Sequence, residues 1–115
     1  MKIYYHVTFE SVFPKLLMNG IVPQKRQIWK NYMGVKLGKQ VVYAYSNWED
    51  AVRWAYRQTW HFQKKTVVLA FKEYEKVMIR PDTYVSGEEF YKEGMIDPEQ
   101  IIDVFDVNSA KMISR

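Results

Sequence analysis

The sequence contains no cysteine and only two histidines, and both scarcities exclude particular kinds of chemistry. Without cysteine there is no disulfide framework, no thiolate nucleophile and no cysteine-ligated zinc or iron–sulfur site. The two histidines, His6 and His61, are 55 positions apart and neither has a cluster of carboxylates beside it, so no metal site is expected. Because a chain without cysteine suits a reducing compartment, we expect a cytoplasmic protein.

Long apolar runs and the common catalytic motifs are also missing. The longest uncharged stretches, such as "VVYAYSNW" and "TVVLAF", are far shorter than the roughly 20 residues of a membrane-spanning helix. No basic and then apolar leader precedes them, so we expect a soluble protein without a membrane partner. The sequence lacks GxGxxG, a glycine-rich loop ending in Gly-Lys-Ser/Thr, HxxxH and GxSxG, which argues against the usual nucleotide-binding and hydrolase sites.

The residues that are present predict one folded domain over residues 1–115. Hydrophobic residues make up 48% and aromatic residues 17% of the chain, which is too apolar for a disordered segment. The net charge of +4 favours acidic partners, although most of the basic residues are scattered. Such a charge is consistent with a nucleic acid, an anionic small ligand or an ordinary solvated surface.

The pattern of apolar residues predicts the order strand, helix, long loop, strand, helix and then strands only. The expected strands are residues 2–7, 41–46, 65–72, 75–81 and 99–107, and the expected helices are residues 10–19 and 46–60. Gly20 ends the first helix, and Ser46 with Glu49 forms a capping box that opens the second. Residues 24–40 are predicted as a long connection, and residues 82–98 as a polar, turn-rich segment with one helical turn. This order predicts an α+β fold with a largely antiparallel or mixed sheet.

Three polar residues are predicted at strand edges, where a side chain can face a cleft instead of the core. His6 stands near the end of the first strand, and Tyr43 lies in "VVYAYS". Glu99 opens the last strand after Pro98 has ended the preceding segment. Each also has a purely structural explanation: a histidine held by backbone, a core ring with its hydroxyl at the rim, and a solvated turn residue.

The motifs around these residues resemble a known family. "YHVT" is similar to a first-strand motif, "VVYAYS" with the following "NWEDAVRWA" to a second, and "PEQIIDV" to a third. Together, in this order and over nearly the whole chain, they resemble the ADP-ribosyltransferase-like fold in its histidine-tyrosine-glutamate branch. The resemblance implies a split mixed or antiparallel sheet with two or three helices and a cleft that binds NAD.

The resemblance further implies transfer of ADP-ribose from NAD to an acceptor, with release of nicotinamide. His6, Tyr43 and Glu99 would be the catalytic residues: His6 would bond a ribose hydroxyl of NAD, Tyr43 would stack on nicotinamide, and Glu99 would hold the ribose 2′-hydroxyl. Thr8 would lie near the nicotinamide amide, and Trp54 would supply a second aromatic wall. A fixed carboxylate suits this reaction because positive charge develops on the ribose as the bond to nicotinamide breaks.

Other residues are expected to contact the cofactor at its edges. Ser46, at the end of the second motif, is expected to contact NAD. Lys25 and Arg26 in the long loop could screen the negative charge of its pyrophosphate. Very small members of this fold occur in bacterial and phage conflict systems, which suggests a protein acceptor by analogy, with a nucleic acid as the alternative. Asp97 stands where members that modify arginine often carry Glu or Gln, so the acceptor stays open.

Two other functions are compatible with the same sequence. One is a non-catalytic module on this fold that binds a protein or nucleic acid through Trp29, Tyr32, Trp54 and the basic loop, because aromatic side chains between basic residues suit both partners. The other is a toxin that hydrolyses NAD, which would consume NAD without modifying an acceptor.

Overall fold

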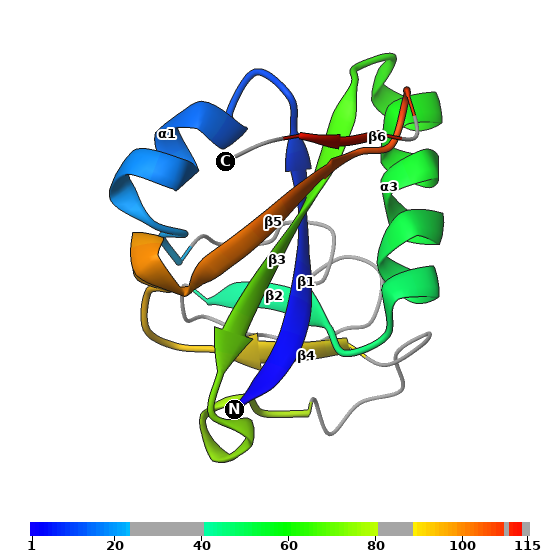
Figure 1. The fold of residues 1–115 in the computed structure, drawn as a ribbon. Coiled ribbons are helices and arrows are strands. Elements are labelled where there is room, and N and C mark those ends of the chain that lie inside the picture. The colour runs from blue at the N-terminus through cyan, green and yellow to red at the C-terminus, as the bar shows by residue number, and fades with distance from the viewer. Residues whose placement is uncertain (24–40, 81–88, 110, 114–115) are drawn as a thin grey trace.

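A computed structural model describes residues 1–23, 41–80, 89–109 and 111–113. Figure 1 shows an antiparallel sheet with one helix on either side, which confirms the predicted α+β class. The predicted connection over residues 24–40 lies outside the described residues. Lys25, Arg26, Trp29 and Tyr32 lie within it.

The described part of the chain contains strands, two α-helices and two short 3₁₀ helices. In chain order the elements are β1 (Lys2–Phe9), α1 (Phe13–Asn19), β2 (Val42–Tyr45), α3 (Trp48–Phe62), β3 (Thr66–Glu73), η1 (Glu75–Val77), β4 (Glu89–Lys92), η2 (Pro98–Gln100), β5 (Ile101–Asp106) and β6 (Lys111–Ile113). The strands form one sheet in the order β4-β2-β1-β3-β5-β6. None of the described helices is both long enough and apolar enough to cross a bilayer.

The sheet separates two apolar clusters, because successive side chains of a strand point to opposite faces. In β3, Leu69 and Phe71 join the cluster that α1 covers, whereas Val68 joins the cluster under α3. The α1 cluster is completed by Leu16 and Leu17 of the helix, and the α3 cluster by alanines that bring the helix close to the strands. The buried strand β3 therefore contributes to both clusters, and each helix covers one of them.

Helix α1 ends at Asn19, as predicted, because Gly20 follows it in a backbone conformation that favours glycine. Its φ is 87°, and a Cβ atom at this position would collide with the carbonyl oxygen of Ile96. That oxygen accepts a hydrogen bond of 2.8 Å from the N–H of Ile21, which ties the segment after α1 to the segment before η2. Gly20 therefore combines a positive φ with a close approach of two backbones.

Replacing Gly20 with Ala is expected to lower the free energy of unfolding by about 2 kcal/mol, because the variant must shift the bridge between Ile21 and Ile96 and adopt a strained φ. Chemical denaturation measures this change. Gly94→Ala is the matched control, since a Cβ atom there meets only the flexible end of Lys92 at 3.4 Å and should change stability by less than about 0.5 kcal/mol. Equal losses in the two variants would contradict the argument.

Helix α3 follows the prediction in length but not in its cap. The N-cap is Asn47, whose side-chain oxygen accepts hydrogen bonds from the backbone N–H groups of Glu49 and Asp50 at 2.8 and 3.3 Å. The prediction that Ser46 caps this helix is therefore wrong by one residue. Since Asn and Ser cap equally well, the sequence "YSNWED" offered two adjacent candidates, and the asparagine serves.

Two predicted segments differ from the structure in the region after β3. Residue 81 of the predicted strand 75–81 lies outside the described residues, and residues 75–80 do not form a strand. Backbone bonds from Val77 to Tyr74 and from Met78 to Glu75 close the short helix η1, and Ile79 then makes one isolated bridge to Tyr91. The partner of that bridge lies in β4, a strand within the segment that was predicted as polar and turn-rich. The last predicted strand begins at Ile101, because Pro98–Gln100 forms η2.

Candidate functional site

Strands β1 and β2 meet near Tyr5 and then diverge. Tyr5↔Tyr45 is the one partner pair between them in the described chain, whereas β1 keeps eight pairs with β3. Figure 1 shows β2 and β4 running across β1 at a steep angle. The sheet consequently opens between residues 6–9 of β1 and the start of β2.

A pocket of about 270 Å³ lies at this opening. It is lined by residues 6–9 of β1, residues 41–43 and 45 in and beside β2, Val12, Leu16, Ile21 and Val22 in and around α1, Trp54 and Gln58 of α3, and Thr66 of β3. Most of these walls are apolar, with a few polar groups among them, which is the usual composition of a small-molecule site. Its volume is near the lower end of the roughly 300–1,000 Å³ typical of ligand pockets.

Four residues that the sequence singles out line this one pocket. His6 and Thr8 come from β1, Tyr43 from β2 and Trp54 from α3. They are brought together although the first and last are 48 positions apart in the sequence. Tyr43 is 9% exposed and Trp54 is half-buried, so the two rings are held largely inside the protein at the pocket wall.

His6 connects the two diverging strands. Its Nδ1 lies 2.6 Å from the carbonyl oxygen of Tyr43. Because a carbonyl oxygen can only accept, Nδ1 must carry the proton and donate it. In a neutral imidazole this assignment makes Nε2 the acceptor of the ring, so a hydroxyl group could donate to it. His6 can therefore fill both of its predicted roles, since one ring nitrogen bonds the backbone and the other can bond a ligand.

Two other predicted site residues lie away from the pocket walls. Glu99 belongs to η2 and is exposed, and it is not among the described residues that line the pocket. Its neighbour Gln100 donates hydrogen bonds to the carbonyl oxygen of Lys72 and to Glu73, at the end of β3 opposite to Thr66. Ser46 is half-buried between β2 and α3 and also does not line the pocket.

Glu89 carries a buried carboxyl group that the sequence patterns did not indicate. This side chain is 5% exposed and begins β4. It stands directly opposite Tyr45 in the register of β2 and β4, so both side chains share one face and their Cβ atoms are about 5 Å apart. Tyr45 lines the pocket. Glu89 itself is not among the described residues that line the pocket, and the strand pairing places it beside one wall residue, Tyr45.

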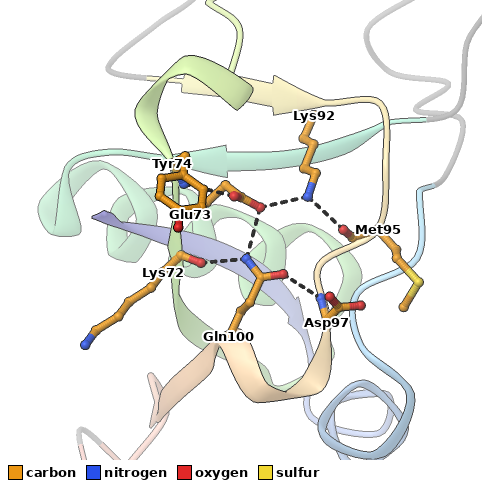
Figure 2. A network of polar contacts seen from close by, with 7 residues as sticks. All are labelled: Lys72, Glu73, Tyr74, Lys92, Met95, Asp97 and Gln100. Atoms are coloured by element: carbon orange, nitrogen blue, oxygen red, sulfur yellow. Dashed lines mark hydrogen bonds and ion pairs between the residues drawn. The ribbon is translucent and has the colours of Figure 1, made fainter.

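The other buried carboxylate among the described residues, that of Glu73, is already engaged elsewhere. Figure 2 shows Lys92 and Gln100 converging on it, and the Nζ of Lys92 lies 2.7 Å from its Oε2. Burial alone would raise the pKa of Glu73, but hydrogen bonds from Lys92, Gln100 and the Tyr74 N–H, together with the charge of Lys92, hold that pKa below its ordinary value. Glu73 therefore serves the fold. Glu89 also has interactions of its own, and it differs from Glu73 in being paired directly with a residue of the pocket wall, Tyr45.

The described residues contain no group of three or more acidic or histidine side chains that could hold a metal ion. Comparisons of the chain with protein-family models, with curated proteins and with solved structures gave no match.

Proposed function

We propose that the protein is an NAD-dependent mono-ADP-ribosyltransferase that transfers ADP-ribose to a macromolecular acceptor and releases nicotinamide. The proposal includes the finer fold, an ADP-ribosyltransferase-like split sheet whose opening is the NAD cleft. One observation carries it: His6, Thr8, Tyr43 and Trp54, chosen from the sequence for their resemblance to that family, line a single pocket where the sheet opens.

The size and walls of the pocket suit one half of NAD. A volume of about 270 Å³ can take a nicotinamide ring with its ribose but not a whole dinucleotide, so the rest of NAD would extend outside it. The rings of Tyr43 and Trp54 offer flat apolar surfaces for the nicotinamide. The Nε2 of His6 can accept a hydrogen bond from a ribose hydroxyl, and the hydroxyl of Thr8 can bond the nicotinamide amide.

The reaction breaks the bond between the ribose C1′ and the nicotinamide nitrogen. The electron pair of this bond leaves with nicotinamide and neutralises its positively charged ring. A lone pair of the acceptor forms the new bond to C1′, and the acceptor releases its proton. Positive charge develops on the ribose between these events, and a fixed carboxylate in a site poor in water stabilises such charge. We assign this part to Glu89 instead of Glu99, because Glu89 is buried beside Tyr45 and Glu99 is exposed in η2.

Calorimetric titration with NAD tests the proposal, and the two histidines supply a matched pair of variants. His6→Ala is expected to weaken NAD binding about tenfold, which is the effect of losing one well-placed hydrogen bond. His61→Ala should bind like the unaltered protein, because His61 is exposed at the end of α3 and does not line the pocket.

His6 also links β1 to β2, so a folding defect must be separated from a binding defect. Thr8→Val provides this second test, since Thr8 lines the pocket and its isosteric replacement leaves the link between the strands intact. Thermal unfolding of each variant shows whether the fold is retained. Unaltered protein that neither binds nor consumes NAD would overturn the proposal, and NAD loss without a modified acceptor would identify a hydrolase instead.

A further inference from the structure

The outward side of α3 carries a row of exposed aromatic and basic residues that the pocket does not use. The row consists of Arg53, Tyr56, Arg57 and Trp60, at the spacing that places side chains on one side of a helix. Trp60 is 79% exposed and Tyr56 is 54% exposed. We refer to these four residues as the α3 row.

Packing of the fold does not account for the α3 row. Helix α3 is fixed to the sheet by its opposite side, where Ala51 and Ala55 are completely buried. In Figure 1 the helix stands at the edge of the molecule with the sheet on its inner side. The neighbouring Phe62 packs edge-on against Phe9 at 5.7 Å, but no ring or cation contact of Trp60 occurs within the described residues. A large exposed ring of this kind indicates an interaction surface.

The charge around the α3 row is mostly positive. Residues 51–65 contain Arg53, Arg57, Lys64 and Lys65 and no acidic residue, so this stretch alone carries +4, as much as the net charge of the whole chain. The acidic residues of α3 are confined to its first turn, where Asp50 lies 3.6 Å from Arg53. For Arg57, no acidic partner occurs among the described residues.

We propose that the α3 row binds single-stranded nucleic acid. Tyr56 and Trp60 are one helical turn apart, with Cβ atoms about 5–6 Å from each other, so two unpaired bases can stack on them. Arg53 and Arg57 stand beside these rings and can neutralise the phosphates that connect the bases. An acidic protein would use the same charges, but it would have no comparable need for two exposed rings between them.

The α3 row adjoins the pocket on the same helix. Arg57 belongs to the row, and the next residue, Gln58, lines the pocket together with Trp54. A strand bound along the row would therefore pass the rim of the pocket. If the protein is an ADP-ribosyltransferase, the bound nucleic-acid strand would be the acceptor of ADP-ribose. This step alone depends on the proposed function.

Fluorescence anisotropy with a labelled 12-nucleotide oligo(dT) tests the binding without NAD, so its outcome is independent of any failure in the NAD experiment. Trp60→Ala is expected to weaken binding about tenfold through the loss of one stacking platform. Arg57→Gln should reduce the slope of log affinity against log salt by about 0.7, the value for one phosphate contact with a single strand. Tyr74→Ala and Lys15→Gln, which alter an exposed ring and an exposed cation away from α3, should leave both quantities unchanged.

Oligo(U), a duplex of the same length and polyglutamate distinguish the classes of ligand. Tight binding of either single strand with weaker binding of the duplex supports the proposal. Whether oligo(dT) or oligo(U) binds more tightly then identifies the ligand as DNA or RNA. The proposal is overturned if neither single strand binds, if Trp60→Ala behaves like Tyr74→Ala, or if polyglutamate binds as tightly as oligo(dT) and independently of Trp60.

Discussion

Replacing Glu89 with Gln is expected to lower the rate of nicotinamide release from NAD by about 10²–10³-fold, the usual effect of removing one group that stabilises developing charge. The replacement keeps the size of the side chain and its place opposite Tyr45, and it exchanges the carboxyl group for an amide that cannot carry a negative charge. Because the charge is needed most when the ribose becomes positive, the turnover number should fall much more than the affinity for NAD.

Glu99→Gln is the matched variant for this prediction. The same change of chemistry in η2, on an exposed residue away from the pocket, should alter the rate by less than about twofold. Nicotinamide release at saturating NAD gives the rate, and calorimetry gives the affinity. A large loss in Glu99→Gln with normal turnover in Glu89→Gln would show that the resemblance of "PEQIIDV" had identified the acid correctly and that our assignment to Glu89 is wrong.

The parts of the fold that could be predicted are those with a strong local pattern. Strands β1 and β3 with their alternation and β-branched residues, the glycine after α1, and the amphipathic helix α3 all follow from residues close together in the sequence. Strand β4 could not be predicted in the same way. It has four residues, of which Glu89 and Lys92 are charged, and it exists because β2 pairs with it and Ile79 bridges to it. Long-range pairing of this kind leaves little trace in a single sequence.

The candidate site likewise contains residues that could be predicted from the sequence and one that could not. His6 and Tyr43 are predictable because each lies in a strand that the sequence marks clearly, and their approach then depends on how β1 and β2 diverge. Glu89 was missed because a buried glutamate is rare and because its strand was not recognised. The usable signal was the pair Phe90-Tyr91, two strand-forming residues within an otherwise polar segment. Glu99 was favoured by its place before a strong strand, and the structure places it in η2, exposed and not among the described residues that line the pocket.

Replacing Lys92 with Met is expected to lower the free energy of unfolding by about 2–3 kcal/mol, which corresponds to a fall of about 10 °C in melting temperature. The change leaves the Glu73 carboxylate, 4% exposed, without the cation that lies 2.7 Å from it. The hydrogen bonds from Gln100 and Tyr74 remain, but they do not compensate a buried negative charge. As a control, Glu75→Gln removes an exposed partner of Lys2 and should cost less than about 0.5 kcal/mol.

Two further measurements separate loss of the ion pair from loss of packing by the lysine stem. Glu73→Gln combined with Lys92→Met should recover part of the stability, since a neutral amide removes the buried charge and its one oxygen can keep the bond from either Gln100 or Tyr74. The pH dependence gives an independent check. Because the pKa of Glu73 in the folded protein is lowered, its contribution is complete above the ordinary value of 4.5 and is lost as the pH falls through the folded value. In Lys92→Met the lysine no longer outweighs burial, which raises the pKa of Glu73, so acid should destabilise that variant less than the unaltered protein.

The contradicting result is a double variant no more stable than Lys92→Met, together with an unchanged dependence of stability on acid pH. It would mean that Lys92 acts through its hydrocarbon stem and that the network in Figure 2 is not held by its charges.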